Sequence, residues 1–234
     1  MSVSLSLVLP CFNEQENIEH TVREAFAWMG KAGVKGEVIV VDDGSKDASA
    51  NVLDGLSKEF SALKVVRHAE NQGYGLAIRS GCDAAMREWI AFVDSDGQFR
   101  IDDLGRLLPH FKSFSFVTGR RKPRADPLIR VLYGKVLALM SWLVFGIWIR
   151  DVNCGMKAFR RDIWPKIRPL YGVEKLFNTE VFLRLRDAKI PYMQVDVPHY
   201  RRRAGSPTGG SLRVIRRMFR ELRDLQQAWA NGGS

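Results

Sequence analysis

The chain has 234 residues, of which 46% are apolar and 26% charged, and its formal net charge is +10. The composition is that of a globular protein without low-complexity tracts or repeats, and the length suits one domain with a sizeable core. Three scattered cysteines, Cys11, Cys82 and Cys154, exclude a disulfide framework and a cysteine-based metal spacing, and they indicate a reducing cytosol.

Charge is distributed unevenly along the chain. Residues 1–118 carry 12 Lys and Arg against 17 Asp and Glu, whereas residues 119–234 carry 24 against 9. An acidic half suits cations and a basic half suits anions. Nucleic acid, anionic lipid and phosphorylated small molecules all fit the second half, so charge alone does not choose among them.

The first half alternates predicted strands and helices. The strands are Leu5–Leu9, Glu37–Val41, Leu63–Val66 and Trp89–Val93, and the helices are Gln15–Met29 (with Asn13 ahead of it), Ala48–Phe60 and Tyr74–Arg87. No basic segment precedes the first apolar run, which is therefore expected to be a strand and not a signal peptide. Continuous apolar strands separated by helices predict an α/β fold with a parallel sheet covered on both faces. Ligands of such sheets bind beyond the carboxyl ends of the strands.

The second half is less regular. Its predicted elements are a strand at Ser113–Thr118, a basic loop at Gly119–Arg124, an apolar segment at Leu128–Ile149, helices at Pro165–Tyr171 and Asn178–Asp187, a strand at Met193–Val197, a basic loop at His199–Gly210 and a helix at Ser211–Trp229. The last helix is amphipathic, with five arginines mostly on one side. They are Arg213, Arg216, Arg217, Arg220 and Arg223.

Two carboxylates follow the fourth predicted strand in the run Asp94-Ser95-Asp96. Both can turn toward one cation once the chain leaves the sheet, and Mg²⁺ or Mn²⁺ prefers such oxygens. Gln98 could add an amide oxygen. The alternative is a solvated turn, because Asp-Gly is also a hairpin signal. An EF-hand loop is excluded, since Gly97 comes too early and no Glu stands at the twelfth position.

The run Asp42-Asp43-Gly44-Ser45 follows the second predicted strand. A carboxylate there can accept hydrogen bonds from a ribose or a base, although an ordinary turn and helix cap explains the run equally well. The dinucleotide fingerprint G-x-G-x-x-G is absent after the first strand, which argues against a dehydrogenase. A nucleotidyltransferase would also want a glycine-rich loop at this position.

Four motifs, LVLPCFNEQENI, VIVVDDGSKD, NQGYGLAIRSG and IAFVDSDGQ, stand in this order over residues 5–98. Together they resemble the inverting glycosyltransferases with the GT-A fold, and most of all the dolichyl-phosphate mannose synthase and polyprenyl-phosphate glycosyltransferase branch. The resemblance continues more weakly through Thr118–Arg120, Asp151–Phe159 and Arg201–Ser206. It implies a single domain with a Rossmann-like, mostly parallel sheet flanked by helices. Residues 1–118 would bind nucleotide-sugar and metal, 119–210 the acceptor, and 211–234 would form a basic amphipathic helix and tail.

The resemblance also implies roles for individual residues. Asp42 would contact the nucleotide, with Asp43 beside it and Pro10, Asn13 and Glu14 lining the pocket. Asp94, Asp96 and Gln98 would hold Mg²⁺ or Mn²⁺ on the donor diphosphate. The catalytic candidates are Asp96 and Asp151, and Asp151 would orient or deprotonate the acceptor unless it is a helix cap or structural carboxylate. The acceptor phosphate would meet Arg120, Arg130, Arg201, Arg202 and Arg203.

The stretch Val136–Ile149 has no charged residue and contains Trp142 and Trp148. Its 14 residues are too few for a bilayer span and suit an interfacial or buried segment. Together with the basic helix from Ser211, it predicts a peripheral protein at the cytoplasmic face of a membrane, with a possible separate anchoring partner. The alternative is a pair of core helices.

The predicted function is metal-dependent, inverting transfer of a sugar from a nucleotide-sugar to a polyprenyl or dolichyl phosphate. The alternative is the same fold acting on a soluble saccharide or another hydroxyl acceptor. A nucleic-acid partner is disfavoured, because two acidic strand ends would repel phosphate and no aromatic stacking pattern accompanies the arginines. The nucleobase, the sugar, the lipid and the oligomeric state stay open.

Overall fold

The computed structural model describes residues 3–123, 135–136, 139, 142–147, 149–172, 174, 176–201 and 212–230, with residues 212–219 described by their backbone only. Seven strands in this part of the chain form one sheet in the order β3-β2-β1-β4-β6-β5-β7. All neighbouring pairs are parallel except those of β6, which is antiparallel to both β4 and β5. The strands are β1 (Ser4–Cys11), β2 (Lys35–Asp42), β3 (Leu63–Arg67), β4 (Trp89–Val93), β5 (Phe116–Arg121), β6 (Met156–Arg160) and β7 (Tyr192–Val197).

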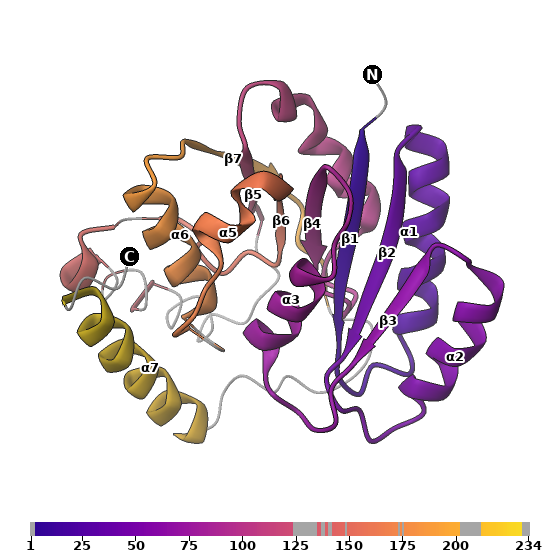
Figure 1. The fold of residues 1–234 in the computed structure, drawn as a ribbon, viewed down its shortest axis with the longest axis horizontal. Coiled ribbons are helices and arrows are strands. Elements are labelled where there is room, and N and C mark those ends of the chain that lie inside the picture. Colours follow the sequence, from indigo (N-terminus) through magenta and orange to yellow (C-terminus); the bar gives the residue numbers. More distant parts are fainter. Residues whose placement is uncertain are drawn as a thin grey trace.

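Helices cover both faces of the sheet (Figure 1). The first face carries α1 (Ile18–Ala32), α2 (Ser49–Glu59) and two 3₁₀ helices, η1 (Ile101–Arg106) and η2 (Leu108–Lys112). The second face carries α3 (Tyr74–Asp83), η3 (Arg161–Ile163), α5 (Trp164–Ile167), α6 (Phe177–Asp187) and α7 (Leu212–Ala230).

Strand β1 shows why the sequence forms a sheet buried on both sides. Leu7 and Leu9 pack toward α1, whereas Val8 between them packs toward α3, and all three are fully buried. Successive side chains of a strand point to opposite faces of the sheet, and here both faces are apolar. Each face therefore needs a layer of helices to cover it. The α/β fold predicted from the strand pattern is therefore confirmed.

Several boundaries differ from those that the sequence predicts. Helix α3 ends at Asp83 and not at Arg87, and β5 is shifted from Ser113–Thr118 to Phe116–Arg121. Helix α1 begins at Ile18 and not at Gln15, and it ends at Ala32. The next residue, Gly33, has a φ of 63° and forms a left-handed C-cap that glycine adopts freely. The helix predicted at Pro165–Tyr171 is a single turn, α5, ending at Ile167. The following backbone N–H groups of Leu170, Tyr171 and Gly172 donate instead to the buried Glu180 carboxylate at 2.6–2.8 Å.

The C-terminal half of α7 packs on α6, at the side of the molecule farthest from α2 (Figure 1). Trp229 donates from Nε1 to Asp187 at 2.8 Å, and the Arg184 guanidinium lies 5.3 Å from the centre of its ring. Leu225 is fully buried in the same contact. Among the described residues, no helix combines the length and the apolar character needed to cross a bilayer.

Candidate functional site

The parallel strands end at one edge of the sheet, and this edge collects the polar motifs. Asp42 is the last residue of β2, and Asp94 directly follows β4. The side-chain hydroxyl of Ser95 donates to the carbonyl oxygen of Pro10 near the end of β1, so the loop after β4 is fastened to the neighbouring strand. Both acidic runs therefore face the same space beyond the sheet.

A cavity of about 460 Å³ lies at this edge over β2 and β3. It is lined by Phe12 after β1, by Asp42, Gly44, Ser45 and Lys46 at the end of β2, and by Arg67–Asn71 after β3. Gly44 allows the two loops to approach, because a Cβ there would lie 2.6 Å from the Glu70 backbone. The cavity is large enough for a nucleoside and offers carboxylate and amide groups to recognise one.

Asp43, next to Asp42, is buried and organises the loop in front of α3. Its carboxylate accepts the backbone N–H groups of Gln72 and Gly73, both at 2.9 Å. It also pairs with Nδ1 of His68 at 2.6 Å, and Nε2 of the same ring contacts the Ser80 hydroxyl at 2.9 Å. These contacts give Asp43 a positioning role around the cavity.

Residues 13–15 and 45–49 form a second set of mutual contacts. The side-chain amide oxygen of Asn13 accepts the backbone N–H of Lys46 at 2.8 Å. The backbone N–H of Asn13 donates to the Ser45 hydroxyl at 3.0 Å. The N–H of Glu14 donates to the Ser49 hydroxyl at 3.1 Å. Asn13 thus contacts two residues that line the cavity, whereas only Asp42 of the predicted nucleotide residues lines it directly.

The Asp94 carboxylate is held from two sides. Oδ1 accepts the hydroxyl of Tyr74, the first residue of α3, at 2.8 Å. Burial and the neighbouring carboxylate raise the pKa of Tyr74 well above its usual value, so the phenol is the donor. On the other side, a Cβ at Gly155 would collide with the Asp94 carboxylate, and the Asp94 N–H donates to the Gly155 carbonyl at 3.1 Å.

Burial, followed by repulsion from Asp96, raises the pKa of Asp94 to about 7. Two carboxylates that disfavour each other's charge fit a hard divalent cation, which relieves the repulsion. Among the described residues, no group of three His, Cys, Asp or Glu side chains could hold a metal alone. Such a cation would therefore complete its coordination with other oxygens. The Gln98 side chain lies against Tyr200, since its Nε2 is 3.4 Å from the Tyr200 carbonyl.

Asp151 is buried in a bidentate ion pair with Arg121. Its Oδ2 accepts both the backbone N–H and Nε of Arg121 at 2.9 Å, and Oδ1 accepts Nη2 at 2.7 Å. Arg121 belongs to β5 and not to the basic loop that the sequence predicts at this point. A carboxylate with three donors from one arginine is firmly oriented.

The side chain of Lys157 in β6 fixes the turn that leads from Asp151 into this strand. It is fully buried and donates from Nζ to the carbonyl oxygens of Val152 and Cys154. Burial lowers its pKa to about 8. A buried ammonium group is costly unless its donors are satisfied, so this turn is strongly constrained.

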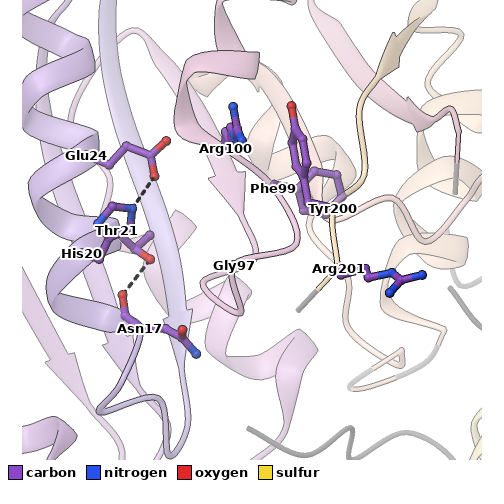
Figure 2. Close-up of a pocket in the computed structure, with 9 residues that line it drawn as sticks. All are labelled: Asn17, His20, Thr21, Glu24, Gly97, Phe99, Arg100, Tyr200 and Arg201. Carbon is purple, nitrogen blue, oxygen red and sulfur yellow. Dashed lines mark hydrogen bonds and ion pairs between the residues drawn. The ribbon is translucent and has the colours of Figure 1, made fainter. Parts of the chain in front are cut away.

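The predicted acceptor arginines are only partly within the described residues. Arg120 pairs with Asp196 of β7 through Nε and Oδ1, 2.5 Å apart. Arg130, Arg202 and Arg203 lie outside the described residues. Exposed Arg201 lies at a cavity of about 210 Å³ between α1 and the loops after β4 and β7, and its side chain extends away from α1 (Figure 2). There the Arg100 guanidinium lies 4.5 Å from the Tyr200 ring centre.

A sequence profile of glycosyl transferase family 2 matches residues 6–168, which is more than half of the chain. The chain belongs to glycosyl transferase family 2. The glycosyltransferase identity predicted from the four motifs is therefore confirmed, and the matched range contains both acidic strand ends, Asp151 and Lys157.

Two relatives of this family 2 glycosyltransferase are described by their acceptors. A dolichyl-phosphate beta-glucosyltransferase of Drosophila melanogaster is 30% identical over 217 residues, or 84% of this chain and 67% of the relative. A dodecaprenyl-phosphate galacturonate synthase of Rhizobium johnstonii is 28% identical over 228 residues, or 96% of this chain and 66% of the relative. The chain spans about two thirds of the length of these relatives.

The fold also has a counterpart among solved structures. Glucosyl-3-phosphoglycerate synthase from Mycobacterium tuberculosis, crystallised with Mn²⁺, uridine diphosphate and glucosyl-3-phosphoglycerate, matches with a TM-score of 0.65. The match covers 94% of this chain and 80% of that one at 20% identity. At this identity the likeness shows the fold alone, and it confirms the GT-A fold predicted for this glycosyltransferase.

Four residues of the site were not found by sequence reasoning: His68, Tyr74, Gly155 and Lys157. The sequence marks Tyr74 as the start of a predicted helix and as a member of the motif NQGYGLAIRSG without giving it a role, and it marks Gly155 and Lys157 only as members of a weakly matching motif. Nothing in the sequence singles out His68. His68 and Tyr74 act through partners 25 and 20 residues away, and Gly155 acts across the pair of strands β4 and β6. The partners of Lys157 are carbonyl groups of the turn before it. The periodicity of a sequence reports none of these contacts.

Proposed function

We propose that this glycosyltransferase moves a sugar, with inversion, from a nucleoside-diphosphate sugar to a polyprenyl or dolichyl phosphate and depends on Mg²⁺ or Mn²⁺. The observation that carries the proposal is the juxtaposition of a nucleoside-sized cavity at Asp42 with the paired carboxylates Asp94 and Asp96 at one sheet edge. Relatives that act on dolichyl and dodecaprenyl phosphates support the acceptor.

On the donor side, Asp42 would accept hydrogen bonds from the nucleoside, while Asp94, Asp96 and Gln98 would hold the cation against the diphosphate. When bound, the cation neutralises the charge that grows on the leaving diphosphate. The protein's own contribution is orientation, since Asp94 is fixed by Tyr74 and by the Gly155 backbone.

On the acceptor side, the state of Asp151 supports a phosphate over a hydroxyl. A phosphate is already ionised at neutral pH and needs positioning, whereas a hydroxyl needs a base. Three hydrogen bonds from Arg121 occupy the Asp151 carboxylate and fix its orientation, which suits positioning an acceptor better than taking a proton from one. We assign Asp151 to orienting the acceptor side, together with Arg120, Arg130, Arg201, Arg202 and Arg203.

The acceptor class is tested with the purified chain, Mg²⁺ or Mn²⁺, a panel of nucleotide-sugars, and either polyprenyl phosphate or soluble saccharides. We expect nucleoside diphosphate release and a mass increase of one sugar on the polyprenyl phosphate, and no product with the saccharides. The panel also identifies the donor. Transfer to saccharides alone would replace the lipid-phosphate proposal with the hydroxyl-acceptor alternative.

We further propose that the chain works peripherally at the cytoplasmic face of a membrane, alone or with a separate anchoring partner. Val136, Leu139, Trp142 and Leu143 are all exposed, as the side chains of an interfacial segment should be. Trp148 lies outside the described residues. Arg220 and Arg223 of α7 are exposed, and a basic residue near an anionic surface contributes about 1 kcal/mol.

We expect the chain to co-sediment with anionic liposomes, to bind neutral ones less, and to be partly released by high salt, which screens the charges. Replacing Arg217, Arg220 and Arg223 with glutamine should weaken this binding and leave donor hydrolysis unchanged. The matched control replaces three exposed lysines of α1, β2 and α2 with glutamine, namely Lys31, Lys35 and Lys58. Protein that stays wholly in the supernatant with anionic vesicles would contradict the membrane proposal.

A further inference from the structure

Tyr74 connects the nucleotide cavity to the metal carboxylates. It is the first residue of α3, and its hydroxyl reaches across the edge to Asp94 Oδ1 at 2.8 Å. The two residues are 20 positions apart in sequence and belong to different layers of the fold. This hydrogen bond links α3 directly to one of the two proposed metal carboxylates.

The backbone that carries Tyr74 is itself fixed from the cavity side. The buried Asp43 carboxylate accepts the N–H groups of Gln72 and Gly73, the two residues before Tyr74. Gly73 has a φ of 103°, and a Cβ there would lie 2.8 Å from the side chain of Glu174. The loop that precedes Tyr74 therefore has little conformational freedom, which fixes the position of the phenol. His68 and Asn71 of the same loop line the cavity.

Asp94 has few ways to rotate once this hydrogen bond is made. Its backbone N–H is bonded to the Gly155 carbonyl, and its carboxylate lies directly over the Gly155 Cα. With Oδ1 on Tyr74, the plane of the carboxylate is set, and so is the direction of its remaining lone pairs. Without the phenol, Oδ1 loses its hydrogen-bond donor, and the carboxylate is freer to turn about its Cβ–Cγ bond.

We propose that Tyr74 is a positioning residue that presents Asp94 to the divalent cation and ties its orientation to the nucleotide-cavity loop. The inference rests on the proposed metal site at Asp94 and Asp96. Groups that hydrogen-bond a metal ligand without touching the metal commonly contribute 10–100-fold in metal affinity. Tyr74 therefore contributes to metal affinity first and to the chemical step only through it.

The test is Tyr74→Phe, which keeps the ring and removes one hydroxyl. Mn²⁺ binding is followed by electron paramagnetic resonance, with Mn²⁺ alone and with Mn²⁺ plus UDP or GDP. We expect Mn²⁺ affinity to fall about 10–100-fold, while binding of the nucleotide in chelator stays at the wild-type level. The Mn²⁺ concentration for half-maximal turnover should rise by the same factor, and kcat at saturating Mn²⁺ should approach that of the wild type.

The matched control is Tyr192→Phe, which removes a hydroxyl from a partly exposed tyrosine at the start of β7, and it should change none of these values. Thermal melting confirms that both variants fold. Unchanged Mn²⁺ affinity in Tyr74→Phe, or a lower kcat that saturating Mn²⁺ does not restore, would overturn the inference while leaving the metal site intact. A wild-type chain that binds no Mn²⁺ even with nucleotide would remove the metal proposal and this inference with it.

Discussion

Asp96→Ala is expected to lower turnover by at least ~10³-fold, because several kcal/mol of charge stabilisation at the diphosphate would be lost. Asp96 follows β4 by three residues, beside Asp94, and its Oδ1 accepts the N–H of Gln98 at 3.1 Å. The measurement is nucleoside diphosphate release from the donor identified in the panel, at several Mn²⁺ concentrations. Metal-dependent donor binding should disappear together with turnover.

The control is Asp102→Ala, which removes an exposed carboxylate from η1 in the same stretch of chain. It should keep wild-type turnover and show that a lost negative charge alone is harmless. Thermal melting should be alike for both variants. Near-normal turnover by Asp96→Ala, or by the wild type in excess chelator, would remove the metal from the mechanism.

Gly155→Ala is expected to lower turnover about 10²-fold, because a displacement of roughly 1 Å at a catalytic constellation has an effect of that size. The new methyl group would collide with the Asp94 carboxylate, so either Asp94 or the β6 backbone must shift. Either shift would disturb the site, because Asp94 belongs to it and β6 pairs with β4, the strand that Asp94 follows. Turnover and Mn²⁺ affinity should fall together.

Gly55→Ala serves as the matched substitution. Gly55 lies within α2, and a Cβ there would meet no atom within 4 Å. Alanine at such a helical position should leave turnover unchanged and stabilise the fold by about 0.4–1 kcal/mol, visible as a higher melting temperature. If Gly155→Ala were as active as Gly55→Ala, the close packing of Asp94 on Gly155 would have no part in the metal site.

Strands of the first half were predictable because their signal is local. The apolar runs before Asp42 and Asp94 are continuous, and a continuous apolar strand between helices has one common solution, a parallel sheet covered on both faces. Strand β6 was not predicted, although Asp151–Phe159 stood out as a motif. It is short and contains Lys157, and its place between β4 and β5 depends on pairing with segments far away in sequence.

The site residues also differ in whether a local sequence signal or a distant contact decides their place. Asp42 was predicted from its place at a strand end, and it lines the nucleoside-sized cavity. The predicted metal roles of Asp94, Asp96 and Gln98 stay predictions, as do the acceptor roles of the arginines. The first residues of the basic loop predicted at Gly119–Arg124 belong to strand β5. Because successive side chains of a strand point to opposite faces, Arg120 pairs with Asp196 and Arg121 with Asp151.

By itself, the sequence determined the layers of the fold, the family and the edge at which its carboxylates gather, because strand ends, helix periodicity and ordered motifs are written in consecutive residues. Only the tertiary structure decided which groups hold those carboxylates. Tyr74 meets Asp94 across 20 residues, and Ser95 meets Pro10 across 85. Such contacts depend on how the sheet brings distant strand ends together, and a hydrogen bond with a range of about 3 Å leaves no periodic trace in a sequence.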